Sequence, residues 1–177
     1  FKAELALRAL DKAWGFTLAQ GRRALEEAKS QIAANEKLAA SMRAYGDYSR
    51  DAVKSVEDFS TAMMQQVGVA DHVTIGIAGQ IKALTGLSNE ALPQATQATI
   101  QLANVANIDL ERSGMMVAKM LLGNTIALQK VGIQIDKTGT STEKLSQFLE
   151  KTGAGWDIAV AQANTFDGAV GRLNQAY

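Results

Sequence analysis

The first 67 residues contain no proline and only three glycines, Gly15, Gly21 and Gly46. Proline is the residue that most often ends a helix, because its ring clashes with the preceding turn and it lacks a backbone N–H. The whole chain of 177 residues has one proline, Pro93, and only 6% of its residues are aromatic. It is rich in alanine, glutamine, leucine and lysine, which favour helices over sheets. We therefore predict an all-α protein.

Residues spaced by seven form two columns along this first segment, which is typical of an amphipathic helix that packs along a seam. We predict one long coiled-coil-like helix over residues 1–67, or two helices that nearly join. The candidate oligomer seam consists of Leu18, Leu25, Ala28, Ile32, Asn35, Met42, Val53, Val56 and Met63. At about 1.5 Å per residue, about sixty-five helical residues would extend roughly 95 Å, so we expect an elongated element.

Several positions of the two columns are small or polar, among them Gly21, Asn35, Gly46 and Ser60. Two interpretations remain open. The segment either packs loosely on its own domain, or it self-associates as a coil in which small residues allow close approach and Asn35 sets the register.

Residues 68–86 are predicted to connect the long helix to the rest of the chain. A short strand is one alternative within this connector, because Val73 to Gly79 contains β-branched residues and two glycines. His72, the only histidine, lies beside Asp71 and is interpreted as a solvated or capping side chain. No second histidine exists to build a metal site.

Capping residues and glycines recur at short intervals over residues 87–177, which predicts a module of several short helices. Asp109 is placed to cap one helix, which Gly123 would end. Thr140 and Glu143 have the spacing of a capping box at the start of another helix.

We expect the core of this module to consist of its regularly spaced apolar residues. They are Leu92, Ile100, Leu102, Val105, Val117, Met120, Leu121, Ile126, Leu128, Val131, Ile133, Leu145, Phe148, Trp156, Phe166 and Leu173. Gly153 and Gly155 are expected to flank a break between helices. Met115 and Met116 are interpreted as core filler or an adaptable interface.

Residues 136–140 read Asp-Lys-Thr-Gly-Thr. They resemble the phosphorylation loop of P-type ATPases and, more loosely, the nucleophile loop of haloacid-dehalogenase-type hydrolases. In those enzymes an aspartate at the end of a strand attacks a phosphoryl group, and Mg²⁺ neutralises charge. Val131 to Ile135 would have to form that strand, yet the chain lacks the alternation of strands and helices that such a fold requires. A phosphoryl-transfer enzyme that uses Asp136 is therefore the remote alternative, and we predict a non-enzyme with no catalytic, cofactor-binding or metal-binding residue.

The charge balance excludes several kinds of partner. Eighteen basic residues match eighteen acidic ones, so no field favours specific binding of nucleic acid or of an anionic membrane. No apolar run has the length of a membrane span, and no cysteine is present to form a disulfide.

The chain begins at Phe1 without a methionine, and we expect it to be a segment of a longer protein.

Three stretches of the second half follow one another in a recognisable order. LTGLSNEAL (Leu84 to Leu92) precedes ANVANIDLERSGMMVAKMLLGNTIALQKVGIQID (Ala103 to Asp136), and AVAQANTFDGAVGRLNQAY (Ala159 to Tyr177) comes last. The stretches contain, in this order, an LTG turn, an apolar helix, a GN break, a GI turn and a T-x-x-G element. In this order the chain resembles bacteriophage tail tape-measure proteins over about residues 80–177. The matching positions are Gly123, Asn124, Gly132, Ile133, Asp136, Thr165, Gly168 and Leu173.

The resemblance implies a structural role without a cofactor. Tape-measure proteins lie as a few parallel copies inside the tail tube of long-tailed phages, and their helical length sets the length of the tube. It implies a parallel homo-oligomer such as a trimer, with tail-tube and tail-tip or baseplate proteins as further partners. It also implies assembly in the host cytoplasm, a place inside the virion's tail tube and release ahead of the DNA at infection.

The alternative function is that of a helical coiled-coil protein of signalling or secretion, with Ala, Gln and Ser in its heptads. It would account for residues 18–67 but not for the capped short helices after them.

Overall fold

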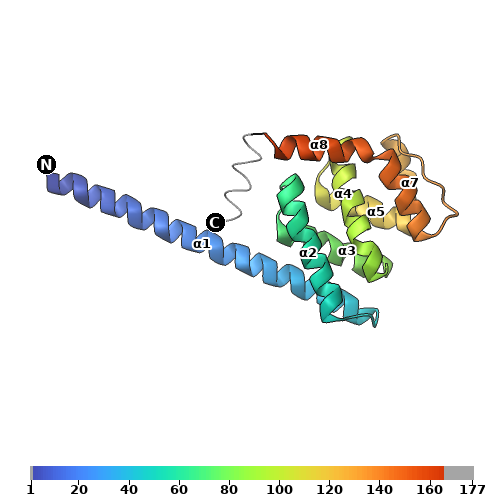
Figure 1. Ribbon diagram of the computed structural model, residues 1–177, viewed down its shortest axis with the longest axis horizontal. Helices are drawn as coiled ribbons and strands as arrows, with labels where there is room; N and C mark the ends of the chain where they lie inside the picture. Colours follow the sequence, from blue (N-terminus) through green and yellow to red (C-terminus); the bar gives the residue numbers. More distant parts are fainter. Residues whose placement is uncertain (1, 166–177) are drawn as a thin grey trace.

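Helices make up the regular structure of the computed structural model, which describes residues 2–165 and the side chains of residues 19–165. No strand occurs in this part of the chain, which confirms the predicted all-α class. A long first helix projects from a bundle formed by its own end and the later helices (Figure 1). The elements are α1 (Lys2–Ala44), α2 (Arg50–Val67), α3 (Asp71–Thr85), the 3₁₀ helix η1 (Asn89–Ala91), α4 (Leu92–Ala106), α5 (Leu110–Leu121), α6 (Ile126–Lys130), α7 (Ser141–Lys151) and α8 (Gly153–Ala163).

The predicted single helix over residues 1–67 is wrong, whereas the alternative of two helices agrees with the structure, because α1 ends at Ala44 and α2 begins at Arg50 after a turn at Gly46. Gly46 adopts a left-handed backbone conformation with a φ of 73°. Ser49 then caps α2 by accepting a hydrogen bond from the backbone N–H of Ala52 at 3.0 Å. The chain folds back at this turn, and α1 alone has 43 residues, or a length of about 65 Å.

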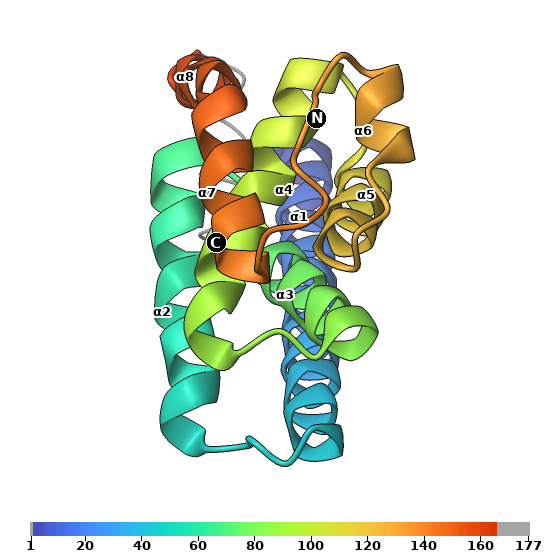
Figure 2. The ribbon, with the colours of Figure 1, turned by 90° about the vertical axis from the view of Figure 1, so that its right-hand side faces the viewer.

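The segment predicted as a connector forms the central helix of the bundle. α3 packs against α1, α2, α4 and α5. In the end-on view of Figure 2, α2 lies on one side of the bundle, α5 and α6 lie on the other, and α3 and α4 lie between them. The short strand considered for Val73 to Gly79 is therefore wrong, because burial on several sides outweighs the local β-propensity of valine and isoleucine.

Gly79 lies where α3 approaches α1 closely. A Cβ atom at this position would lie 3.3 Å from the backbone of Leu38. Leu38 itself is completely buried. The absence of a side chain at Gly79 therefore lets the two helices cross with their backbones nearly in contact.

A buried lysine joins the turn after α1 to the segment after α3. Lys82 has no exposed surface, forms an ion pair with Asp47 and donates a hydrogen bond to the carbonyl oxygen of Leu87 at 2.7 Å. Its Nζ also lies 5.5 Å from the centre of the Tyr45 ring. The side chain of Asn89 donates to the backbone carbonyl of Asp47 at 2.8 Å, which ties the same two segments together again.

Most of the predicted core of the short-helix module is confirmed. The buried members are Leu92, Ile100, Leu102, Val117, Met120, Leu121, Leu128, Ile133, Leu145 and Phe148. Three predictions are wrong, since Val105, Ile126 and Val131 are exposed. α6 is only five residues long and turns one residue, Leu128, inward. Trp156 is half-buried, and Phe166 and Leu173 lie outside the described residues.

The predicted caps are confirmed. Asp109 accepts a hydrogen bond from the backbone N–H of Arg112 at 2.7 Å. Thr140 and Glu143 form both halves of the capping box: the backbone N–H of Thr140 donates to the Glu143 carboxylate at 2.7 Å, and the N–H of Glu143 donates to the Thr140 hydroxyl at 3.3 Å.

Gly155 lies inside α8, so the predicted break at this position is wrong. A Cβ atom there would lie 2.2 Å from the backbone carbonyl oxygen of Gln101 in α4. Nearby, the Thr152 hydroxyl donates to the side chain of Gln101 at 2.9 Å. The absence of a side chain at Gly155 allows α8 to pack closely on α4.

We expect Gly155→Ala to lower the free energy of unfolding by about 3 kcal/mol, because the methyl group would meet a backbone atom that has little room to move. Gly153→Ala is the matched control, since a Cβ atom at Gly153 has no neighbour within 4 Å. The control should be neutral or stabilising by up to about 1 kcal/mol. Urea unfolding followed by circular dichroism measures both. Equal stability of the two variants would contradict the close packing of α8 on α4.

Candidate interaction surfaces

The candidate oligomer seam divides into a part inside the bundle and a part on the projecting segment of α1. Met42 and Val56 are buried in the main core, and Met63 is buried in a second cluster with Val67, Ile100 and Ala159. The chain's own helices therefore cover these three seam residues, and their heptad spacing reflects packing within one chain. Val53 is half-buried against the main core.

Asn35, expected to set the register between copies, has a partner in its own chain. Its side-chain N–H donates to the carboxylate of Glu57 in α2 at 2.7 Å. The contact ties α1 to α2 within one chain, so the polar residue fixes the α1–α2 pairing.

The rest of the seam is exposed. Every described side chain from Ala19 to Ser30 is exposed. The exposed fraction is 55% for Leu25 and 64% for Ile32. These two residues and Ala28 are three, four and seven positions apart, so they share one face of the helix. We name Leu25, Ala28 and Ile32 the α1 stripe; Leu18 lies outside the described side chains.

His72 of α3 contacts Glu27 of α1. Its Nδ1 lies 3.1 Å from a carboxylate oxygen of Glu27. It does not cap α3, whose N-cap residue is Ala70. Beside it, burial raises the pKa of Asp71, although the Thr61 hydroxyl donates to this carboxylate at 3.4 Å.

The loop around Asp136 is a polar turn. Val131 to Ile135 form no strand, so the structural element required by the phosphoryl-transfer alternative is missing there. Asp136 is fully exposed, and it accepts hydrogen bonds from the backbone N–H and the hydroxyl of Thr138 at 2.9 and 2.7 Å. These two bonds hold the pKa of Asp136 below its usual value.

The family-like motif positions shape the turns around α6. Gly123 and Gly132 have φ values of 89° and 81°, a left-handed conformation that suits glycine. Asn124 accepts from the backbone N–H of Ile126 at 3.3 Å, and Ile133 is buried below the turn. Thr165 is the last described residue, and Gly168 and Leu173 lie beyond it.

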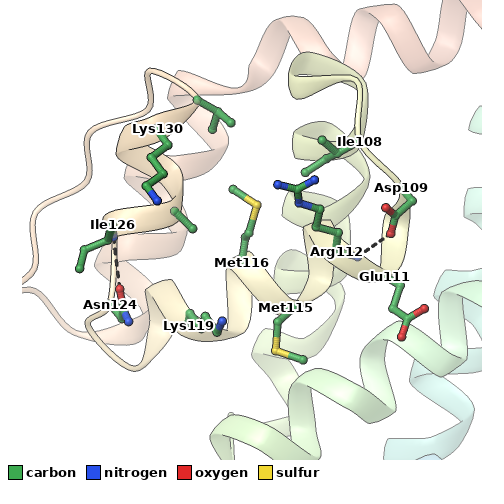
Figure 3. A pocket seen from close by; sticks show the side chains of 12 residues that line it. Ile108, Asp109, Glu111, Arg112, Met115, Met116, Lys119, Asn124, Ile126 and Lys130 are labelled. Carbon is green, nitrogen blue, oxygen red and sulfur yellow. Dashed lines mark hydrogen bonds between the residues drawn. The ribbon is translucent and has the colours of Figure 1, made fainter.

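These turns position α6 beside α5 and leave a groove of about 620 Å³ between them (Figure 3). We name it the α5–α6 groove. Its lining combines apolar and charged residues: Ile108, Asp109, Glu111, Arg112, Met115, Met116, Lys119, Asn124, Ile126, Ala127, Lys130 and Val131. The adjacent methionines were the one signal in the sequence for this surface. The pairing of α5 with α6 could not be read from it.

Neither a cluster of metal-ligating side chains nor a membrane-spanning helix occurs in the described part of the chain. Among residues 2–165, no group of three or more His, Asp or Glu side chains is placed to hold a metal ion. No helix in this range is long and apolar enough to cross a membrane. Comparison of the chain with protein-family models, curated proteins and solved structures gives no match.

The capping box predicts a pH dependence of stability. The backbone and hydroxyl groups of Thr140 bind the Glu143 carboxylate, and they lower its pKa from an ordinary value of 4.5. A carboxylate with a lowered folded-state pKa stabilises the fold above the unfolded-state pKa, and this contribution disappears as the pH falls through the folded-state pKa. We therefore expect the difference in stability between the wild type and Glu143→Gln to be constant near neutral pH and to vanish at acidic pH.

Urea unfolding at a series of pH values from about 7 down to about 2.5 measures this difference. Glu150→Gln is the control, because Glu150 lies on the same helix outside the capping box. If the difference in unfolding free energy between the wild type and Glu143→Gln did not change with pH, the assigned role of the Glu143 carboxylate would be refuted.

Proposed function

We propose that the chain is a structural segment of a bacteriophage tail tape-measure protein, in which α1 supplies helical length and the bundle holds the end of this rod. The observation that carries the proposal is the projection of α1 from the bundle with its side chains exposed from Ala19 to Ser30 (Figure 1). The order of motifs over residues 80–177, which resembles that family, supports the same conclusion.

A helix is suited to measuring length because each residue adds a fixed rise of about 1.5 Å. The bundle holds the C-terminal end of α1 through the contact of α1 with α3. In the proposed role the protein lies inside the tail tube of the virion, contacts tail-tip or baseplate proteins and leaves ahead of the DNA at infection. The role is mechanical and requires no cofactor.

The exposed part of α1 favours self-association. Most of the stability of a helix in a protein comes from packing of its apolar face, and the described residues leave Leu25 and Ile32 of the α1 stripe largely exposed. Parallel copies would cover Leu25 and Ile32 with the same residues of a neighbour, and the small Ala28 between them allows close approach. We propose a parallel homo-oligomer, of which a trimer is one form.

Replacing the two large residues of the stripe tests this association. Leu25→Glu combined with Ile32→Glu should weaken self-association about tenfold or more, because carboxylates would have to be buried between copies. The bundle should keep its stability, since both side chains are exposed in the single chain. Sedimentation velocity measures the association.

Ala19→Glu combined with Ser30→Glu is the matched control. It adds the same charge at exposed positions on the opposite face of α1. The control should associate like the wild type. If both double variants associate equally well, the α1 stripe is not the contact between copies.

Changing the length of α1 in the parent phage tests the ruler itself. Removal or duplication of residues 19–25 preserves the heptad phase, so each step should change tail length by about 10 Å, which is seven residues at about 1.5 Å. Electron microscopy of tails from a series of one to four duplications gives the change in tail length per added residue. A seven-residue insertion in the exposed loop at residues 136–140 is the control and should leave tail length unchanged. If tail length stayed constant across the whole series, the proposed function would be wrong.

A further inference from the structure

The α5–α6 groove combines an apolar floor with an exposed apolar rim. Met116 is buried at its base, whereas Ile126 and Val131 are exposed beside it, at 56% and 39%. Methionine side chains are flexible and polarisable, and they adapt to the shape of whatever packs on them. The groove thus offers an apolar surface that the chain's own described residues leave uncovered.

Three cations line this groove without a carboxylate partner. Arg112, Lys119 and Lys130 are exposed, and within the part of the chain that the structure describes none of them forms an ion pair. Arg112 and Lys119 are seven residues apart on α5, so they lie on one face of that helix about 10 Å apart along its axis. Lys130 belongs to α6, on the other wall.

Neither acidic residue of the lining, Asp109 or Glu111, forms an ion pair with these cations among the described residues. Asp109 accepts the backbone N–H of Arg112 as the N-cap of α5. Figure 3 shows Arg112 and Met116 extending from α5 into the space beside α6, whereas Glu111 points away from Met116. The groove therefore presents its apolar floor together with positive charge from both walls.

These features specify the chemistry of an occupant. A helix with one apolar face can lay that face into a groove between two helices, and carboxylates along its edges would meet the unpaired cations. Single-stranded nucleic acid is a poorer fit, because the lining has no aromatic side chain on which bases could stack. A second copy docking through its α1 stripe is a poorer fit too, because the exposed Arg22 lies beside that stripe and Glu26 is already paired with Lys29 at 2.9 Å.

We propose that the α5–α6 groove docks an acidic amphipathic helix of a partner protein. The apolar face of that helix packs on Met116, Ala127 and Val131, and its carboxylates pair with Arg112, Lys119 and Lys130. This interaction is independent of the proposed function, because it rests only on the lining of the groove.

Three labelled helical peptides of about 14 residues, the length of four turns, probe the groove. The first has leucines at positions a and d of a heptad with glutamates beside them. The second replaces each glutamate by lysine, and the third keeps the acidic composition but scrambles the leucines. Fluorescence anisotropy with the whole chain should show binding of the first peptide and affinities about tenfold or more lower for the other two.

Variants of the chain locate the binding. The triple variant Arg112→Glu, Lys119→Glu and Lys130→Glu should lose about tenfold or more in affinity for the first peptide. Its matched control is the triple variant Arg22→Glu, Arg23→Glu and Lys137→Glu, which changes the same charge at exposed positions outside the groove and should bind like the wild type. Circular dichroism confirms that both triple variants stay folded.

A second pair of variants tests the apolar contact. Ile126→Gln combined with Val131→Gln should weaken binding, whereas Leu84→Gln combined with Ile158→Gln, at exposed positions elsewhere, should not. Equal affinity for the acidic and basic peptides would overturn the proposal, as would full affinity of the groove triple variant. Tighter binding of a single-stranded oligonucleotide of the same charge than of the acidic peptide would also overturn it.

Discussion

The crossing of α1 over α3 is the contact on which the rest of the structure depends. It requires a glycine at position 79, because a Cβ atom there would press on the backbone of Leu38. α3 in turn touches α2, α4 and α5, so the helix that holds the rod is also the centre of the bundle. The direction in which α1 leaves the bundle is thus set by the same residues that organise the core.

A polar contact reinforces this crossing one turn further along α3. The ammonium group of Lys82 is completely buried, and such burial is costly unless the charge is paired and its hydrogen bonds are satisfied. Asp47 and the Leu87 carbonyl provide these partners, and both come from segments that must sit at fixed places for the pair to form. The contact therefore favours one register of α1 and α2 against α3. A second polar contact, from the Asn35 amide to the Glu57 carboxylate at 2.7 Å, joins α1 directly to α2.

The sequence could predict features that depend on neighbouring residues. Asp109 and the Thr140–Glu143 pair act within one turn of the chain, so their capping roles follow from spacing alone. It could not predict features that depend on distant residues. From the sequence alone Gly79 suggests the end of a possible strand and Gly155 a break, and only the positions of Leu38 and Gln101 show that both glycines allow close helix packing. For the same reason, heptad spacing could not separate the seam residues buried in the bundle from the exposed α1 stripe, and it could not show the α5–α6 groove.

α1 should project from the bundle in one fixed direction, because Leu38 and Met42 anchor it in the core and Glu27 contacts His72. The chain has no cysteine, so spin labels can be attached to cysteines introduced at Gln20 and Lys137, which are both exposed. Electron–electron double resonance on labelled protein diluted with an excess of unlabelled protein then reports the distance within one chain. We expect a single, narrow distance distribution centred on the separation of these two sites when α1 projects from the bundle. A broad distribution, or one shifted to short distances by α1 lying against the bundle, would contradict it.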